Sequence, residues 1–267
     1  MIKCDYHLHT NHSDGRSTME EYILRALELK LEELCFTDHY EINADIEDSV
    51  FEDTDVDEYV NEFNHMKNKY GHLINLRLGI EIGFRPEVVE QVKELLSNYK
   101  FDFVIGACHV IDKQDIGWKP KVFLQKFGAE NAHKIYLEQT YKMVVLFNEF
   151  DVWAHFDYIV RYCGNEYLDY PEYSELIDKI LLELIKKDKG IEVNTSGFNY
   201  GLDAPHPNYE ILKRYKELGG KIITIGSDAH RLGHLSNKFD EIEQKLKEIG
   251  FEYITVYENR VPRFIRI

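Results

Sequence analysis

The chain has 267 residues, of which 48 are acidic and 32 basic, so its formal net charge is −16 with neutral histidines. Roughly 250 residues are ordinary for a single α/β barrel, and a hydrophobic content of 44% provides for a sizeable core. The acidic excess argues against a nucleic-acid binder, which needs a basic face, and against docking on anionic lipid. A small anionic substrate is still possible, because local charges can reverse the field inside a cleft.

The chain shows no pattern of export or membrane insertion. Its first residues, Met1 to His7, lack the apolar run of a signal peptide, and no stretch approaches the ~20 apolar residues of a membrane span. The acidic stretch from Glu47 to Glu58 lacks the glycine and the final glutamate of a calcium loop, so we expect a solvated loop there. Widely spaced cysteines without a CxxC pair favour buried, reduced thiols and a cytoplasmic protein. They are Cys4, Cys35, Cys108 and Cys163.

Short apolar runs alternate with amphipathic stretches along the whole chain. The runs predict strands at residues 2–6, 33–37, 76–82, 102–108, 151–155, 190–194, 221–225 and 252–257. The stretches between them predict helices near 18–30, 57–70, 86–97, 121–127, 131–149, 173–188, 207–218 and 236–248. Ser17 and Glu20 predict a capping box for the first helix, and Pro86 suits the first turn of the third. Gly190 and the pair Gly219-Gly220 are placed where helices should stop before strands.

Strands that alternate with helices predict βαβ units and a parallel sheet. The chain has no linker rich in proline, glycine or serine, so these units predict one closed α/β barrel in a single domain spanning residues 1–267. The run at 252–257 is either an eighth strand or an outer one. We predict a barrel of seven strands.

Nine side chains that can ligate a metal fall at the C-terminal end of a predicted strand or just beyond it. In a barrel these ends share one face, where the βα loops build active sites. Taken singly, some have ordinary explanations: Asp14 before Gly15 suits a turn, and Asp228 suits a helix cap. Those explanations do not account for the shared register with strand ends, so we predict a metal site. The nine residues are His7, His9, Asp14, His39, Glu81, His109, His155, Asp228 and His230.

Neutral imidazoles and carboxylates suit zinc, manganese or iron, and the absence of cysteine from the set argues against a closed structural zinc site. Nine ligands are too many for one ion. Three divalent ions that share a bridging carboxylate would leave positions open for water and substrate, and such clusters generate hydroxide and neutralise a reacting phosphoryl or carbonyl group. Their six positive charges would exceed the three ligand carboxylates, giving a local balance of about +3 in an acidic protein.

Several short motifs contain these residues. They are Asp5-Tyr6-His7-Leu8-His9-Thr10, Asp14-Gly15, Thr37-Asp38-His39, Gly79-Ile80-Glu81 and Gly226-Ser227-Asp228-Ala229-His230. In combination they resemble the polymerase and histidinol phosphatase (PHP) superfamily over essentially the whole chain. The segments from Ala154 to Tyr162 and from Glu192 to Gly197 look like its histidinol-phosphate phosphatase branch.

The resemblance implies a distorted (β/α)7 TIM-like barrel with three metal ions. By that pattern His7, His9, Glu81 and Asp228 hold the first ion. Glu81 also serves the second, with His109 and His155, and the third takes Asp14, His39 and His230. The implied reaction is hydrolysis of L-histidinol phosphate to L-histidinol and phosphate in histidine biosynthesis, by attack of a metal-bridging hydroxide on phosphorus.

Five residues are candidates for substrate contact or proton transfer. Arg161, in the loop after the fifth strand, is the first candidate to bind the phosphoryl group, although a surface salt bridge would also explain it. Arg16 is a weaker candidate, since it could simply precede the helix cap. His206 could bind phosphate, protonate the leaving alkoxide or be a rigid loop residue. Asp228 could relay the proton if its second oxygen is free, and Asn194 is a plausible supporting hydrogen-bond partner.

Three other functions remain open. A related phosphoesterase could act on another small phosphate ester, phosphotyrosine or a nucleotide end. A metal-binding module without catalysis would be expected to have lost some of the ligands. A C–N hydrolase would often use a metal-bridging lysine, which has no evident counterpart at the ends of the fourth or fifth predicted strand. We expect a monomer or dimer without nucleic-acid or membrane partners. Of the other histidines, His12 and His234 could lie at the rim, and most are expected at the surface, among them His65, His72 and His133.

Overall fold

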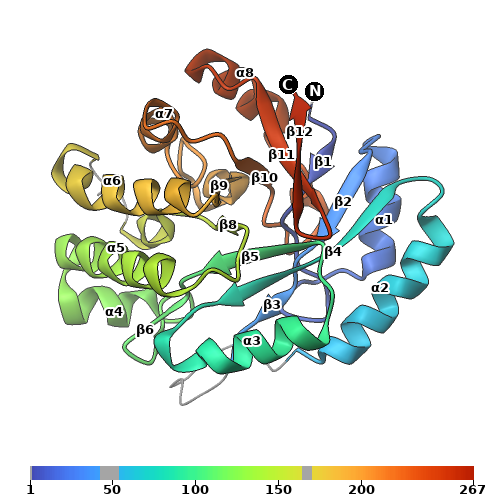
Figure 1. The fold of residues 1–267 in the computed structure, drawn as a ribbon, viewed down its shortest axis with the longest axis horizontal. Coiled ribbons are helices and arrows are strands. Elements are labelled where there is room, and N and C mark those ends of the chain that lie inside the picture. Colours follow the sequence, from blue (N-terminus) through green and yellow to red (C-terminus); the bar gives the residue numbers. More distant parts are fainter. Residues whose placement is uncertain (1, 43–53, 164–169) are drawn as a thin grey trace.

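The fold centres on a parallel sheet that curves almost completely onto itself, with helices around it (Figure 1). The computed structural model describes residues 2–42, 54–163 and 170–267. Seven strands follow one another in the order β1, β2, β4, β5, β8, β9, β10, and every neighbouring pair is parallel. The prediction of a seven-stranded α/β barrel is therefore confirmed. The strands are β1 (Cys4–Asp5), β2 (Glu33–Phe36), β4 (Asn75–Gly83), β5 (Phe103–Ala107), β8 (Val152–Trp153), β9 (Gly190–Asn194) and β10 (Ile223–Gly226).

The first and last barrel strands meet at and just beyond their C-terminal ends. The Tyr6 N–H donates to the carbonyl of Ile225 at 2.9 Å, and the Asp228 N–H donates to the carbonyl of His7 at 2.8 Å. An isolated parallel bridge joins Leu8 to Ala229. The barrel is thus drawn together at the end where the predicted ligands lie.

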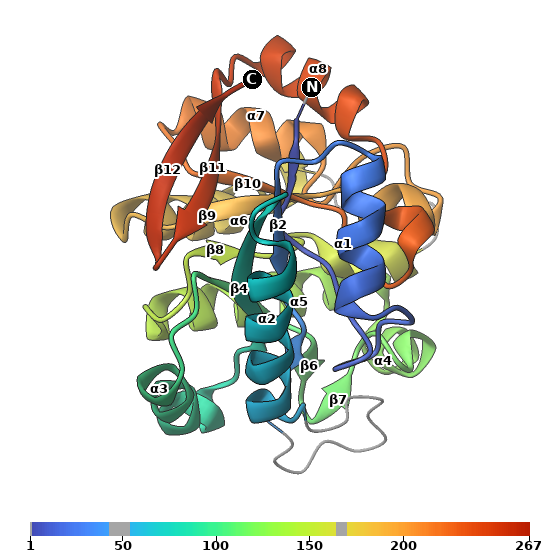
Figure 2. The same ribbon diagram turned by 90° about the vertical axis from the view of Figure 1, so that its right-hand side faces the viewer.

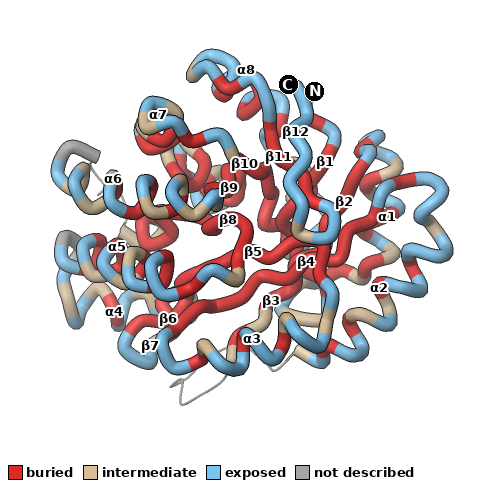
Figure 3. The backbone as a smooth tube through the Cα atoms, in the orientation of Figure 1, coloured by how far each residue is buried: buried red, intermediate tan, exposed pale blue. Residues whose placement is uncertain are grey.

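Within the described ranges, eight α-helices cover the outside of the barrel, as the sequence predicts (Figure 3). The helices contribute buried apolar residues to the core, and Figure 3 shows the barrel strands buried and the outer helix faces exposed. The helices are α1 (Met19–Glu28), α2 (Val56–Tyr70), α3 (Val89–Asn98), α4 (Pro120–Phe127), α5 (Ala129–Leu146), α6 (Tyr170–Lys186), α7 (Tyr209–Glu217) and α8 (Phe239–Ile249). Short 3₁₀ turns are η1 (Pro86–Val88), η2 (Tyr158–Tyr162), η3 (Thr195–Tyr200) and η4 (Leu232–His234).

The capping box of α1 lies one residue later than predicted. Thr18 is the N-cap: its hydroxyl accepts from the Glu21 N–H at 3.2 Å, and the Glu21 carboxylate accepts from the Thr18 N–H at 2.9 Å. Ser17 is buried instead, and Glu20 pairs with Lys69 at 2.5 Å. The spacing of the motif was correct, but two overlapping serine/threonine–glutamate pairs satisfy it.

Of the two glycine positions predicted to end helices, only one does so in the structure. Gly219 follows the C-cap of α7 with φ of 93°, a conformation that favours glycine, so this prediction is confirmed. Gly190 is the first residue of β9 and does not end a helix. The chain leaves α6 at Lys186 and turns at Asp188, which has φ of 54°. Pro86 begins η1, directly before α3.

The run at 252–257 is an outer strand. It forms β11 (Tyr253–Glu258), which pairs antiparallel with β12 (Val261–Arg266), a strand that the sequence did not predict (Figure 2). The ring of Tyr257 stacks on Phe103 with centroids 4.9 Å apart, and its backbone N–H donates to the Tyr6 hydroxyl at 2.9 Å. This hairpin therefore packs on residues of barrel strands, and it is a sheet of its own.

Three further two-residue strands lie near the C-terminal ends of the barrel strands. β3 (His39–Tyr40) pairs with β4 and places His39 opposite Glu81. β6 (Val110–Ile111) and β7 (Gln114–Asp115) form a small hairpin after β5. They were not predicted; β3 contributes His39 and β7 contributes Asp115 to the site described below.

The buried apolar side chains form one cluster with members from β1 to β11. A single domain spanning residues 1–267 remains our interpretation of that cluster. Cys4, Cys35 and Cys108 are buried, and burial raises the pKa of each thiol, as expected for inert cysteines; Cys163 is half-buried. No helix in the described ranges has the length and apolarity needed to cross a bilayer.

The acidic stretch from Glu47 to Glu58 falls largely outside the described residues. Within its described part, Asp55 caps α2 by accepting a hydrogen bond from the N–H of Glu58 at 3.0 Å. Asp57 lies in the first turn of that helix, where its charge favours the helix N-terminus.

Candidate metal centre

The nine predicted ligands converge at one end of the barrel. Each lies at the end of a strand or in the loop that follows it. Asp14 and His230 have side-chain exposures of 37% and 33%, whereas the other seven expose 10% or less. Burying carboxylates and imidazoles costs free energy unless they are paired or bind a cation. The burial of seven such side chains therefore points to a cation site.

Glu81 occupies the middle of the set and presents its two oxygens to different histidines. Its Oε2 lies 3.3 Å from His7 Nε2 and 3.6 Å from His9 Nε2. Its Oε1 lies 2.9 Å from His155 Nε2 and 3.5 Å from His109 Nε2. A carboxylate placed in this way can bridge two cations.

We define two inner positions around Glu81. The first inner position lies among His7 Nε2, His9 Nε2, Glu81 Oε2 and Asp228 Oδ1, which is 3.3 Å from His9 Nε2. The second inner position lies among Glu81 Oε1, His109 Nε2 and His155 Nε2. Both groupings follow the pattern that the family resemblance implied.

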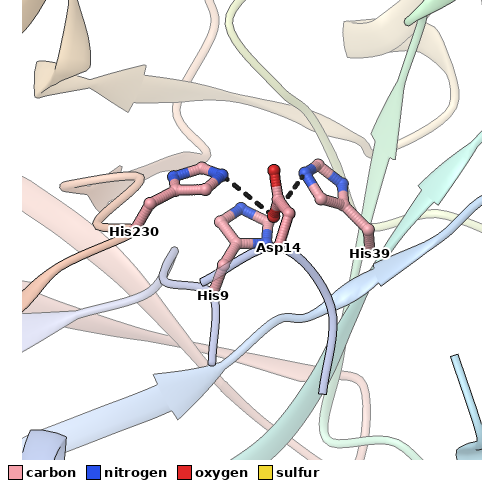
Figure 4. Close-up of side chains that lie close together, drawn as sticks. All are labelled: His9, Asp14, His39 and His230. Atoms are coloured by element: carbon pink, nitrogen blue, oxygen red, sulfur yellow. Dashed lines mark ion pairs between the residues drawn. The ribbon is translucent and has the colours of Figure 1, made fainter. Parts of the chain in front are cut away.

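The outer position is formed by Asp14, His39 and His230 (Figure 4). Asp14 Oδ1 lies 3.2 Å from His230 Nε2 and 3.6 Å from His39 Nε2. The ring of His9 stacks against both imidazoles, with centroid separations of 4.1 Å to His39 and 4.3 Å to His230. His9 is therefore close to the outer position as well as to the first inner one.

The residues fit divalent transition metals. Nε2 atoms face each other at 3.0 Å between His7 and His9 and at 3.2 Å between His109 and His155, contacts that a shared cation would stabilise. Burial lowers the pKa of His9 to about 3 and that of His155 to about 4, so both are neutral imidazoles. Neutral imidazoles grouped with carboxylates are the ligands that zinc, manganese and iron prefer.

The ligand carboxylates are ionised. Burial would raise the pKa of Glu81, but His7 and its neighbouring histidines bring that pKa well below the ordinary value. Burial opposes ionisation of Asp228 too, yet His7, His9 and Arg161 hold the pKa of Asp228 well below its usual range. The carboxylates are therefore available to cations, while the pKa values of His7, His39 and His230 are raised in the metal-free protein by the same carboxylates.

The backbone at two ligands has an unusual conformation. His155 has φ of 22° and Asp228 has φ of 52°, values that L-residues rarely adopt. Such strain persists only where surrounding contacts hold it, and it concentrates at functional sites. This conformation directs the His155 side chain toward Glu81 and the Asp228 side chain toward His9.

Arg161 lies at the wall of a cavity of about 140 Å³ beside the ligands. Its guanidinium is between the rings of Tyr158 and Tyr200, 4.5 Å and 4.6 Å from their centroids. Nη2 donates to Asp228 Oδ2 at 2.9 Å and to the Ser196 hydroxyl at 2.5 Å. The alternative of a surface salt bridge does not hold, since the side chain is only 4% exposed.

His206 faces Arg161 and does not line this cavity. Its Nδ1 lies 2.5 Å from a carboxylate oxygen of Asp157, and its Nε2 accepts from Arg161 Nε at 3.1 Å. Nε2 therefore has no proton to give to a leaving group. The geometry gives no support to direct phosphate binding or acid catalysis by His206, and supports a role in holding Arg161.

The proton relay predicted for Asp228 required a free second oxygen, and that condition is not met. Oδ2 receives hydrogen bonds from Arg161, from Ser196 at 3.0 Å and from Asn194 at 3.3 Å. Asn194 is fully buried, so it suits the supporting role and not direct substrate contact. Arg16 is exposed and is not among the residues that line the cavity, although its N–H donates to the carbonyl of His230.

Sequence reasoning missed two carboxylates beside the ligands. Glu192, in β9, lies 2.6 Å from His7 Nδ1, and Glu41, just after β3, lies 2.6 Å from His109 Nδ1. The available signal was a charged residue inside an otherwise buried run, as in β9. His133 was expected at the surface but is buried. His12 is half-buried and pairs with Glu62 at 2.7 Å.

Residues 5–196 match the PHP domain family. The chain belongs to the PHP domain family. A probable histidinol-phosphatase of Thermotoga maritima is 33% identical over 254 residues, covering 94% of each chain. The histidinol-phosphatase of Lactococcus lactis is 28% identical over 267 residues, covering 96% of this chain and 95% of the relative.

A solved PHP-type structure has the same fold over its whole length. It is the crystal structure of histidinol phosphate phosphatase from Lactococcus lactis, complexed with zinc, L-histidinol and phosphate. The TM-score is 0.87 at 26% identity, and the alignment covers 98% of both chains.

Proposed function

We propose that this PHP-domain protein is a metal-dependent phosphomonoesterase that hydrolyses L-histidinol phosphate to L-histidinol and phosphate. The observation that carries the proposal is the buried ligand set around Glu81, with Arg161 on the adjoining cavity wall. Relatives that cover nearly the whole chain are named histidinol-phosphatases, and one binds zinc, histidinol and phosphate. The names of these relatives support histidinol phosphate as the substrate, and the ligand set supports metal-dependent hydrolysis.

The ligand set suits three divalent ions, two at the inner positions and one at the outer position. When bound, such ions supply charge neutralisation at the phosphoryl group and a water of lowered pKa. Zinc is the first candidate, because six of the nine ligands are imidazoles and a relative holds it. The number of ions and their identity are part of the proposal.

Arg161 is placed to bind the phosphoryl group. Burial would lower the pKa of its guanidinium, but Asp228 and nearby tyrosines keep the pKa above its ordinary value, so it stays charged. Nε and Nη2 are engaged by His206, Ser196 and Asp228. Nη1 makes no hydrogen bond within the described chain, which leaves it for a phosphate oxygen.

Asp115 is our candidate for the substrate's ammonium group. It is buried in the cavity wall, and the N–H groups of Gly117 and Trp118 donate to its Oδ1 at 2.9 Å and 3.0 Å. Among the described lining residues, the other two acids are ligand candidates. Trp118 is half-exposed at the same wall and offers an aromatic face to an imidazole.

Kinetics on a panel of phosphate esters test the substrate, with metal content measured on the same preparation. Histidinol phosphate should have a far higher kcat/KM than p-nitrophenyl phosphate, phosphotyrosine or a nucleotide. If it is turned over no faster than p-nitrophenyl phosphate, the substrate assignment is wrong and a different phosphate ester must be sought. Full activity with well under one ion per chain would refute metal dependence.

A further inference from the structure

Two buried carboxylates contact the ligand histidines from behind. Glu192 Oε1 is 2.6 Å from His7 Nδ1, and Glu41 Oε1 is 2.6 Å from His109 Nδ1. Each imidazole turns its other nitrogen, Nε2, toward Glu81. An ionised carboxylate only accepts hydrogen bonds, so the proton must be on Nδ1 and the lone pair of a neutral imidazole on Nε2.

We propose that Glu192 and Glu41 are positioning residues that fix the metal-binding tautomer of His7 and His109, and that only Glu192 requires a carboxylate to do so. The inference rests on the proposed metal centre and concerns residues that do not themselves touch the ions. Such partners orient a ligand and raise its basicity, and their loss typically weakens metal binding by ~10–100-fold.

The requirement at Glu192 comes from its second oxygen. Oε2 accepts from the His155 N–H at 3.1 Å and from Asn194 Nδ2 at 3.0 Å. The Asn194 amide cannot turn round, because its Oδ1 already accepts from the Ser196 N–H at 2.9 Å. Two fixed donors therefore face one side of the Glu192 carboxylate.

An amide at position 192 meets these donors with its single oxygen. In the Glu192→Gln variant the carbonyl oxygen must face the His155 N–H and the Asn194 amide, so the NH2 group faces His7 Nδ1. That NH2 donates to Nδ1, and the His7 proton moves to Nε2, the atom that faces the first inner position. Glutamine is equal in size to glutamate, yet the proton on His7 Nε2 prevents that atom from binding a metal ion.

Glu41 supplies the matched control. It is also buried and also 2.6 Å from a ligand imidazole, but its Oε2 makes no hydrogen bond within the described part of the chain. In the Glu41→Gln variant the carbonyl oxygen can keep the hydrogen bond from His109 Nδ1 while the NH2 group takes the other place. Both variants lose one negative charge near the centre, but only Glu192→Gln is expected to change the tautomer of its ligand histidine.

Zinc binding separates the two variants. Bound zinc is counted by elemental analysis, and affinity is measured by competition with a chromophoric chelator, for the wild type, Glu192→Gln and Glu41→Gln. We expect Glu192→Gln to lose an ion or to bind it about 100-fold or more weakly, while Glu41→Gln keeps the wild-type count with a loss of about tenfold or less. Equal losses in the two variants would overturn the inference.

Two measurements keep the test decisive. Circular dichroism of the metal-free variants checks that they fold. If Glu192→Gln does not fold, ¹⁵N NMR of histidine-labelled, zinc-loaded wild type takes its place. We expect the imidazole proton on Nδ1 of His7 and of His109, and a proton on Nε2 of either residue would contradict the inference. Wild-type zinc content and turnover are measured in parallel. A wild type that binds no zinc and hydrolyses no histidinol phosphate refutes the proposed function, whereas an active zinc enzyme whose variants lose zinc equally refutes only the tautomer argument.

Discussion

Replacement of Arg161 by methionine tests its role in binding the phosphoryl group. Three of its hydrogen bonds are already made to His206, Ser196 and Asp228, so Nη1 is the nitrogen left for phosphate. A hydrogen bond between charged groups is worth about 1.5–3 kcal/mol, and each 1.36 kcal/mol is a factor of ten in rate. We expect kcat/KM for histidinol phosphate to fall by ~10–150-fold.

The assay follows released phosphate, inhibition by inorganic phosphate and metal content together. Metal content should be unchanged, because Asp228 Oδ2 keeps Ser196 and Asn194 as donors. Inhibition by phosphate should weaken in step with kcat/KM. Arg161→Lys is the control, since lysine retains the charge but not the planar fork, and we expect it to recover only part of the loss. Activity and phosphate inhibition within about twofold of the wild type would refute the reasoning.

Two further predictions concern neighbouring histidines. His206→Ala should lower kcat/KM less than Arg161→Met does, and adding it to Arg161→Met should cost little more, because His206 acts through Arg161; fully additive losses would indicate a separate contact. Burial alone would lower the pKa of His39, but nearby carboxylates raise it to about 10 in the metal-free protein. His39 is then protonated at neutral pH, so metal binding should release protons and strengthen as pH rises toward that value. Calorimetry in buffers of different ionisation enthalpy measures the release, and a buffer-independent binding heat would contradict it.

The ligand set could be predicted because barrel topology leaves little freedom. Parallel strands linked by helices bring every strand end to one face, so residues as distant as His7 and His230 had to meet. The same reasoning could not find the small additions to the barrel. β3, β6 and β7 are two residues long, too short for an alternating pattern, and all six residues of β12 are exposed.

Roles that depend on hydrogen-bond partners could not be predicted from position alone. His206 and Asp228 were correctly placed near the site, but the sequence does not show which of their atoms are already engaged. Arg161 occupies both the Nε2 of His206 and the Oδ2 of Asp228, which removes the two proton-transfer roles proposed for them. Glu192 and Glu41 escaped notice for the converse reason, since a lone acid in a buried segment does not identify its partner.

Charge sets an order of binding at this centre. The three ligand carboxylates and the two carboxylates behind them face one arginine, and protonated histidines of the metal-free protein offset only part of that excess. Three divalent ions would reverse the sign, so an anionic substrate should bind after the ions and not before. Calorimetric titration with inorganic phosphate should show binding to the zinc-loaded protein and an affinity at least ~100-fold lower without zinc, a difference of roughly 2.7 kcal/mol. Equal phosphate affinity in both forms would mean that Arg161 alone attracts the phosphoryl group, and that the ions serve only the later chemistry.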